Sequence, residues 1–237
     1  MAERSFDLAE LQNLLERIKG LKVACVGDLM LDRFVYGEVS RISPEAPIPV
    51  LKTRRSVAMP GGVGNVARNV AAMGAVARLG AVAGRDAAGD ELAALIAGED
   101  RIDDVLTRPE GAETIVKTRF VSSGQQLLRL DEEAAPHAGY ADATVFEGAS
   151  AILLSDYAKG VVDDGLIQSA LAAGAAFNAP VIVDPKGTDF ARYGSVDLIK
   201  PNASELSGAT GMPVGTDQEV EAALQALLDT TSVKAVV

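Results

Sequence analysis

From residue 141 onward, short apolar runs alternate with segments whose apolar residues recur every three or four positions. The short runs predict buried strands and the periodic segments predict helices. In chain order we expect a helix at 141–148, a strand at 151–154, a helix at 163–175, a strand at 180–183, a short helix near Phe190, a strand at 196–199, helices at 202–208 and 216–229, and a strand at 233–237. Strands that alternate with helices form a parallel sheet covered on both faces, so this half indicates an α/β fold.

The first half of the chain continues the alternation but contains two segments of a different kind. The alternating elements are a helix at 7–19, a strand at 21–26, a helix at 65–73, a strand at 75–83, a helix at 88–97 and a strand at 102–106. No helical period fits residues 33–59, where prolines favour extended backbone and short strands at 50–53 and 56–58. Residues 113–131 have two arms around a turn at 122–124. We therefore expect two β excursions from an α/β domain.

Polar residues follow four of the predicted strands. Asp28 and Asp32 come after the first, and polar stretches at 155–160, 184–189 and 200–205 follow three later ones. The carboxyl ends of parallel strands meet at one edge of a sheet, where α/β proteins bind ligands. The stretch Pro60–Asn65 adds three glycines before a helix, which allow a ligand to approach the backbone. By itself, that stretch is more often a tight turn with a helix cap.

Two further pairs of residues each have two explanations. Asn202 and Glu205 lie three apart at a predicted helix start. They fit a capping box, or a phosphate contact by Asn202 with Mg²⁺ held by Glu205 through water. Lys117 and Arg119 share one face of a predicted arm. They fit an anion contact, or solvated charges that protect an exposed edge.

Composition excludes several classes of protein. A net charge of −11 over 237 residues argues against a general nucleic-acid or membrane-surface role. Cys25 is the only cysteine and lies in an apolar run, so we expect a buried thiol. His137 is the only histidine, which leaves little support for Ser/His/Asp catalysis. The sequence lacks a Walker A motif and a GxGxxG after its first strand. Without a signal peptide or a long apolar run, we expect a cytoplasmic protein.

The sequence resembles the ribokinase-like (PfkB) sugar kinases. The glycine stretch with Asn65, Ala67, Gly74 and Gly84 resembles their first signature, although Val63 stands where the family usually has a small residue. Within the family, five strings resemble the heptose 7-phosphate kinases: residues 27–33, 40–47, 125–131, 154–160 and 184–190. The resemblance implies a three-layer α/β/α sandwich with a mostly parallel central sheet. It also implies a small β lid, formed by about 33–59 and 113–131, that often makes a dimer contact.

The resemblance implies a kinase that uses ATP and Mg²⁺ to phosphorylate the anomeric hydroxyl of D-glycero-β-D-manno-heptose 7-phosphate. The 1,7-bisphosphate product feeds the ADP-heptose of lipopolysaccharide core. Carried over by motif, the sugar hydroxyls would be held by Asp32, Gly61, Gly62 and Asn65. Asp184 and a supporting Lys186 would face the sugar and phosphates. ATP would be bound by Asn202, Ala203, Ser204 and Glu205, with Glu205 on Mg²⁺ through water. As a hypothesis, the 7-phosphate is assigned to Lys117, Arg119 or Arg129.

One part of the family pattern is absent from the sequence. The Gly-Ala-Gly-Asp segment, which supplies the catalytic base and an anion hole, has no counterpart within residues 1–237, so we expect the base to lie beyond Val237. Residues 1–237 would then be the N-terminal part of one kinase domain, with little or no turnover, because losing a general base typically costs roughly 10²–10⁴-fold in rate. We also expect an apolar sheet edge left open at the final strand.

Three other functions remain alternatives at this point. One is a different sugar kinase of the same fold, of the fructokinase or ribokinase kind. Another is a module that binds a sugar phosphate without catalysis. A Rossmann dehydrogenase is the weakest, because its glycine fingerprint is missing.

Overall fold

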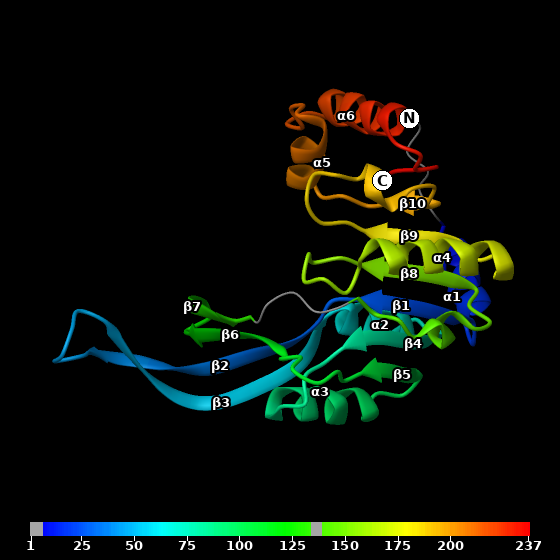
Figure 1. Cartoon of the computed structure of the whole chain (residues 1–237). Helices are drawn as coiled ribbons and strands as arrows, with labels where there is room; N and C mark the ends of the chain where they lie inside the picture. The colour runs from blue at the N-terminus through cyan, green and yellow to red at the C-terminus, as the bar shows by residue number, and fades with distance from the viewer. Residues whose placement is uncertain (1–6, 134–138) are drawn as a thin grey trace.

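The computed structural model describes residues 7–133 and 139–237. Its centre is a six-stranded sheet in the order β10-β9-β8-β1-β4-β5, with every neighbouring pair parallel (Figure 1). The strands are β1 (Lys22–Gly27), β4 (Val76–Val82), β5 (Ile102–Thr107), β8 (Ala151–Ser155), β9 (Val181–Asp184) and β10 (Leu198–Ile199). The apolar runs of the sequence thus form the parallel sheet that their alternation with helices predicts.

Two apolar clusters lie on opposite faces of this sheet, because successive side chains of a strand point in opposite directions. On β1, Cys25 belongs to one cluster and its neighbours Ala24 and Val26 belong to the other. The first cluster includes residues of α2 (Val63–Ala72) and α3 (Ala87–Ala97). The second includes residues of α4 (Asp164–Phe177), α5 (Ala203–Thr210), α6 (Asp217–Thr230) and the 3₁₀ turns η1 (Ala143–Phe146) and η2 (Ala191–Tyr193). The three-layer α/β arrangement is confirmed.

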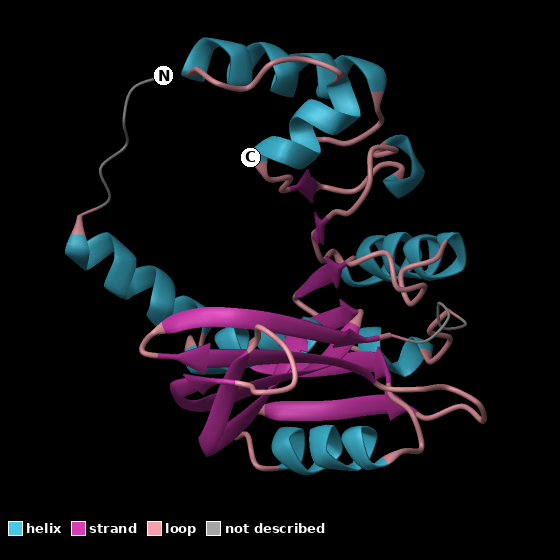
Figure 2. Cartoon of the chain, turned by 90° about the vertical axis from the view of Figure 1, so that its left-hand side faces the viewer, coloured by secondary structure: helices cyan, strands magenta, loops and turns pink. Residues whose placement is uncertain are grey.

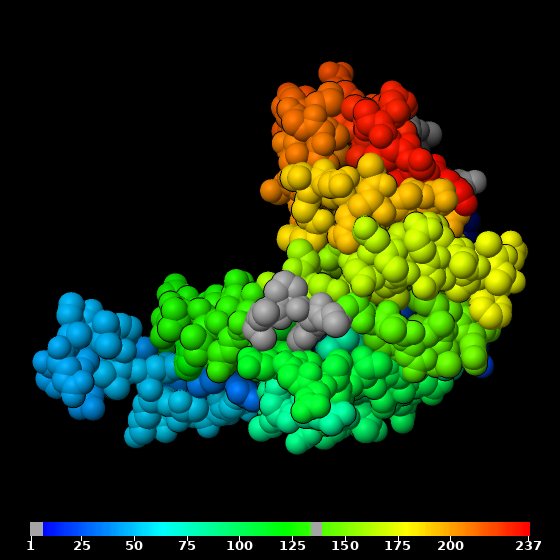
Figure 3. All heavy atoms as spheres, in the orientation of Figure 1, coloured from blue at the N-terminus to red at the C-terminus, as the bar shows by residue number. Residues whose placement is uncertain are grey.

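A second sheet forms the lid and projects from one end of the central sheet (Figures 1 and 3). It has the order β3-β2-β6-β7. Its strands are β2 (Leu29–Ile42), β3 (Pro49–Gly62), β6 (Ile115–Ser122) and β7 (Gln125–Glu132). The pairs β2–β3 and β6–β7 are antiparallel, and β6 runs parallel to β2. The two β excursions of the sequence are therefore one sheet.

The strands of this region are longer than the sequence predicts. Short strands at 50–53 and 56–58 were expected, but β3 runs for 14 residues, and β2 also runs for 14 residues and includes Asp32. The segment 113–131 joins the same sheet, since β6 pairs with β2 over eight positions. Backbone pairing between segments distant in sequence extends these strands, and such pairing leaves no local periodic signal.

The two faces of the lid sheet differ in character. Leu29, Leu31 and Val116 lie on the face toward α2 and α3 and join the core cluster there. Arg33 on the same face forms an ion pair of 2.5 Å with Glu91 of α3. Asp32 and Lys117, which are register partners, lie on the opposite face. The core thus covers one face of the lid, and the charged side chains of Asp32 and Lys117 lie on the other, which we call the charged face.

The start of the chain agrees with the sequence prediction, and one later helix does not. α1 (Leu8–Ile18) forms as predicted, but it has no buried residue and extends away from the sheet (Figure 2). The predicted helix at 141–148 is only the turn η1. Within the two described ranges, no helix has both the length and the apolar character needed to cross a membrane.

The last five residues do not form the strand that the sequence predicts. The predicted strand at 233–237 is reduced to one isolated bridge, between Val236 and Ile199. The Val237 N–H still donates a hydrogen bond to the Ile199 carbonyl oxygen at 3.1 Å, but the residue is 63% exposed. The expectation of a regular core strand ending at Val237 was therefore wrong. The segment forms one bridge, although the Lys234 N–H also donates to the Val196 carbonyl oxygen and the Ile199 N–H to the Ala235 carbonyl oxygen, both at 3.0 Å.

Candidate active site

The glycine stretch closes β3 and opens α2. Gly61 lies on the same face of the lid as Asp32, and a Cβ atom on Gly61 would clash with the Asp32 carboxylate. Gly62 has φ +58°, and a Cβ atom there would clash with the Asp28 carbonyl oxygen. Asn65 is exposed in the first turn of α2. The stretch is therefore a strand end joined directly to a helix, and its glycines let the Asp32 carboxylate lie against the backbone.

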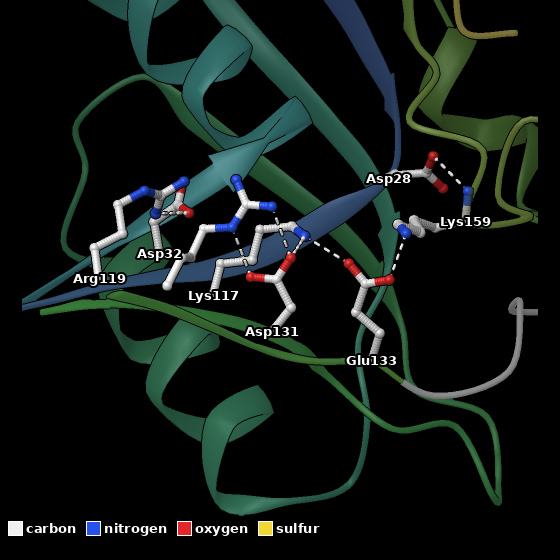
Figure 4. A network of polar contacts seen from close by, with 8 residues as sticks. Asp28, Asp32, Lys117, Arg119, Asp131, Glu133 and Lys159 are labelled. Atoms are coloured by element: carbon white, nitrogen blue, oxygen red, sulfur yellow. Dashed lines mark hydrogen bonds and ion pairs between the residues drawn. The ribbon is translucent and has the colours of Figure 1, made fainter. Parts of the chain in front are cut away.

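The three basic residues assigned to a phosphate come together on this charged face, each paired with a carboxylate (Figure 4). Arg119 Nη1 lies 2.5 Å from Asp32 Oδ1. Arg129 Nε lies 2.8 Å from Asp131 Oδ1, and Lys117 Nζ lies 3.1 Å from Asp131 Oδ2. The three cations thus lie close together, as a contact with an anion requires. An incoming anion would meet cations that already have partners.

Lys117 has a second carboxylate partner that the sequence did not single out. Its Nζ donates to Glu133 Oε1 at 2.5 Å, and Lys159 Nζ donates to Glu133 Oε2 at 2.5 Å. Burial opposes the charge of Lys117, but the hydrogen bonds to Glu133 and Asp131 raise its pKa above the ordinary value. The hydrogen bonds from the two lysines also lower the pKa of Glu133. Lys117 and Glu133 are therefore held in their charged forms.

Asp28 shapes the loop that follows β8. The side chain is fully buried, and its carboxylate accepts hydrogen bonds from the backbone N–H groups of Tyr157, Lys159 and Val161 at 2.6, 3.1 and 3.2 Å. Burial raises the pKa of Asp28, although these three donors oppose the rise. Of the two carboxylates after the first strand, Asp28 thus caps a loop, and Asp32 faces the lid.

A second polar group lies where β9 and β10 end. A cavity of about 200 Å³ is lined by Asp156, Tyr157, Asp184, Pro185, Lys186, Lys200, Asn202 and Glu205. Asp184 at the end of β9 lies 3.2 Å from Lys200 Nζ. Glu205 Oε1 accepts a hydrogen bond from Lys186 Nζ at 3.0 Å. Asp184 and Lys186, assigned to the sugar and phosphates, therefore share one cavity with Asn202 and Glu205, assigned to ATP.

The catalytic base stays a prediction. The sequence assigns no base within the chain and expects it beyond Val237, with Lys186 in a supporting role. Lys186 lines the cavity, whereas Val237 is not among the residues that line it. Val237 is bound instead to the backbone of Ile199 in β10.

The start of α5 is a capping box, as the first of the two explanations predicts. The Glu205 N–H donates to Asn202 Oδ1 at 2.9 Å, and the Asn202 N–H donates to Glu205 Oε2 at 2.9 Å. Ala203 and Ser204 are exposed in the same first turn. Capping does not exclude a ligand, because Glu205 still lines the cavity and the helix N-terminus favours an anion.

Tyr157 is affected by charges of both the lid face and the cavity at the ends of β9 and β10. Burial raises the pKa of its phenol, and the charges of Asp184 and Asp32 raise it further, while Lys186 opposes them. Asp32 belongs to the lid side and Asp184 to the cavity, so both act on one side chain. In Figure 3 a broad hollow separates the lid from α5. The sequence noted the polar stretch containing Tyr157 and Lys159 but did not assign either residue.

The donor set fits a magnesium ion that keeps most of its waters. In the part of the chain that the structure describes, no cluster of three or more His, Cys, Asp or Glu residues forms a metal cage. Glu205 and Asp184 instead supply single carboxylates to the cavity. Mg²⁺ in phosphate-transfer sites commonly takes one or two carboxylates together with water and substrate phosphates. His137 lies outside the described residues.

Known proteins match this chain over most of its length. The family described as pfkB family carbohydrate kinase matches residues 21–237. The chain is 46% identical to the bifunctional protein HldE of Hyphomonas neptunium over 240 residues, which cover 97% of this chain and 49% of that protein. It is 45% identical to the bifunctional protein HldE of Rhodospirillum rubrum, over 93% of this chain and 46% of that protein. The chain thus spans about half the length of these curated relatives.

Solved structures show the same fold at lower identity. The phosphofructokinase-2 of Escherichia coli in complex with substrates and products superposes with a TM-score of 0.68 at 24% identity, over 92% of this chain and 72% of that one. The ribokinase of Arabidopsis thaliana complexed with ribose and ATP superposes with a TM-score of 0.65 at 22% identity, over 92% of this chain and 71% of that one.

Proposed function

Because the chain belongs to the pfkB family of carbohydrate kinases, we propose that it binds D-glycero-β-D-manno-heptose 7-phosphate and ATP for phosphoryl transfer to the anomeric hydroxyl. The 1,7-bisphosphate would then supply ADP-heptose for lipopolysaccharide core. One observation carries this proposal: Asp32 and the basic cluster share one face of the lid. The heptose-kinase strings of the sequence and the relatives named bifunctional protein HldE support the choice of sugar.

The sugar half of the proposed site is the charged face of the lid together with the glycine stretch. The Asp32 carboxylate would accept hydrogen bonds from sugar hydroxyls. Gly61 and Gly62 would allow the ring to approach the backbone, and the exposed Asn65 amide would complete this side. A carboxylate and an amide are suited to a polyol, because hydroxyls both donate and accept hydrogen bonds.

The nucleotide half is the cavity at the ends of β9 and β10. The first turn of α5, from Asn202 through Ala203 and Ser204 to Glu205, would face the ATP phosphates, and Lys186 would contribute a positive charge. Glu205 would hold Mg²⁺ through water. When bound, Mg²⁺ would offset the negative charge of the ATP phosphates. Asp184 and Tyr157 would then lie between the nucleotide and the sugar.

Removing a cation from the lid should selectively weaken the binding of the phosphorylated sugar. Replacing Lys117, Arg119 or Arg129 by alanine is expected to weaken binding of heptose 7-phosphate by about tenfold or more, because hydrogen bonds to charged groups contribute roughly 1.5–3 kcal/mol. Binding of unphosphorylated heptose should change much less. Calorimetric titration with both sugars measures the difference. Arg54→Ala, which removes an exposed lid arginine paired with Glu38, is the matched control. Equal losses for both sugars would contradict the assignment.

Two alternatives have their own tests. A fructokinase-like or ribokinase-like specificity would appear as a preference for unphosphorylated sugars in a substrate panel. A binding role without catalysis would appear as calorimetric binding of heptose 7-phosphate with no phosphate transfer from ATP. The expectation that residues 1–237 show little turnover stays a prediction for the same assay, as does their place in the cytoplasm.

We also propose that the other face of the lid forms a homodimer contact. Its outer part carries an apolar groove of about 380 Å³, lined by Ile48, Pro49, Leu51, Phe120, Leu127 and Leu128. Leu128 is 59% exposed and Ile48 is 56% exposed. Apolar side chains gathered on one surface are typical of protein–protein contacts. The opposite, charged face would remain open to the sugar in such a dimer.

A charge in this groove should weaken self-association. Leu128→Asp is expected to weaken the dimer by about tenfold or more, because an unpaired carboxylate would be buried in the contact. Sedimentation velocity over a concentration series measures this effect. Leu8→Asp places the same change on an exposed leucine of α1 and should leave the association unchanged. A wild-type chain that stays monomeric throughout the series would refute the proposal.

A further inference from the structure

Glu133 lies between two lysines that come from different parts of the fold. Lys117 belongs to β6 of the lid, and Lys159 belongs to the loop after β8 of the central sheet. Each ammonium nitrogen lies 2.5 Å from a different oxygen of the Glu133 carboxylate (Figure 4). The two nitrogens are therefore positioned to bind two oxygens of a single anionic group.

The lysines are held more firmly than the carboxylate. Lys117 sits in the β6 ladder opposite Asp32, and its side chain is only 12% exposed. The backbone N–H of Lys159 is bound by the buried Asp28 carboxylate. Glu133 instead follows the last residue of β7, and the pairing of β7 with β6 ends one residue earlier, at Glu132. Its side chain can leave the two lysines without breaking a backbone hydrogen bond of the sheet.

We infer that Lys117 and Lys159 form the subsite for the phosphate group of the sugar substrate, and that Glu133 occupies this subsite until the phosphate displaces it. The inference rests on the proposed function and names the residues that recognise the phosphate end of the sugar. A phosphate group, like a carboxylate, presents several oxygens on one atom. It also carries a charge of about −1.5 to −2 at pH 7, which exceeds that of a carboxylate.

The surrounding charges suit this exchange. The ion pairs of this network join four basic side chains and three carboxylates, so these seven groups carry one positive charge in excess. The chain as a whole has a net charge of −11. When Glu133 leaves, the excess becomes two, which a phosphate dianion neutralises. Asp131 stays on Arg129 and Lys117, and Asp32 stays beside the sugar hydroxyls.

The position of the subsite also matches the shape of the proposed substrate. Lys117 is the register partner of Asp32, so the two side chains project from adjacent positions on the same face. A sugar ring over Asp32 and Gly61 would thus place its substituents within reach of Lys117. Lys159 lies two residues after Tyr157, which borders the nucleotide cavity. The phosphate would therefore bind at the junction of the lid and the central sheet.

The test compares three probes on the full chain by calorimetry: heptose 7-phosphate, unphosphorylated heptose and inorganic phosphate. Lys159→Met should weaken the binding of heptose 7-phosphate by about tenfold or more, since a charge-assisted hydrogen bond is lost. Its affinity for unphosphorylated heptose should stay within about twofold of the wild-type value. Lys52→Met, at an exposed lysine of β3, controls for the general loss of charge. A loss that is equal for both sugars, absent, or matched by Lys52→Met would overturn the phosphate subsite.

A second variant tests the displacement itself. Glu133→Gln should bind inorganic phosphate several-fold more tightly than the wild-type chain, because no charged group has to leave, and adding Lys159→Met should remove the gain. Phosphate binding that is unchanged or weaker in Glu133→Gln would overturn the role of Glu133. The measurement with inorganic phosphate does not depend on the identity of the sugar. If the wild-type chain binds neither sugar, the proposed function fails. The tighter phosphate binding of Glu133→Gln, and its loss when Lys159→Met is added, still test the phosphate subsite.

Discussion

Replacing Asp28 by alanine should lower the free energy of unfolding by about 3–5 kcal/mol, because three backbone N–H groups lose their acceptor at once. Each unsatisfied buried donor costs roughly 1–3 kcal/mol, and partial entry of water reduces the sum. The loop that these donors hold carries Tyr157 and Lys159. Binding of heptose 7-phosphate should therefore fall together with stability. Urea unfolding followed by calorimetric titration of the folded variant measures both effects.

The control for this substitution is an exposed aspartate on β5. Asp103→Ala should change the free energy of unfolding by no more than about 0.5 kcal/mol. Asp28→Asn should give an intermediate loss, since it keeps one acceptor oxygen and removes the charge that burial disfavours. A loss of less than about 1 kcal/mol in Asp28→Ala would show that Asp28 does not hold the loop together.

Because the pKa of Asp28 is raised in the folded chain, the difference in stability between the wild-type chain and Asp28→Asn depends on pH. The ordinary value is 3.8, and burial raises the pKa in the folded chain while the backbone donors oppose the rise. Between 3.8 and the folded value, the folded state binds the proton more readily than the unfolded state. The stability of the wild-type chain relative to Asp28→Asn should therefore rise as the pH is lowered through this window. A relative stability that falls on acidification would contradict this sign.

Replacing Gly61 by alanine should abolish most sugar binding with a smaller effect on stability. The added Cβ atom would clash with the end of the Asp32 side chain, which would have to rotate away from Arg119. We expect binding of heptose, with or without its phosphate, to weaken by about 100-fold, because a charge-assisted contact is lost and a methyl group covers the backbone. Calorimetry with both sugars measures this loss.

Gly98→Ala provides the matched control for Gly61. Gly98 has φ −83°, and the nearest atom to an added Cβ would be the Leu95 carbonyl oxygen at 3.5 Å, an ordinary contact. That variant should bind both sugars like the wild type. Unlike the lysine substitutions, Gly61→Ala should not discriminate between the phosphorylated and unphosphorylated sugar. Retention of wild-type binding by Gly61→Ala would remove Asp32 and Gly61 from the sugar site.

The sequence predicted those features that local patterns encode. The alternation of apolar runs with periodic segments is a short-range signal, and it located β1, β4, β8 and β9 to within one or two residues. The capping box of Asn202 and Glu205 depends on two residues three positions apart, so it was also visible. The gathering of polar strand ends at one edge followed from the general geometry of parallel sheets.

The features that the sequence did not reveal depend on contacts between distant segments. The parallel pairing of β2 with β6 joins residues 85 positions apart, as in Asp32 with Lys117, and no periodicity signals it. The carboxylate partners of the basic cluster were missed for the same reason. Glu133 meets Lys159 only because the lid folds over the loop after β8. Asp28 was recognised as a polar strand end, but its three backbone donors belong to residues 157–161.

The parallel pairing of β2 and β6 also sets an order of folding. The β2–β3 hairpin joins neighbouring segments and needs only a short loop to close. The β2–β6 pairing must close a loop that contains β3, α2, β4, α3 and β5, which carries a larger entropic cost and slows formation. The hairpin can therefore form early, whereas the lysine and arginine side of the sugar surface is completed later, when β6 pairs with β2. Amide protection after a refolding pulse should thus appear in β2–β3 before it appears between β2 and β6.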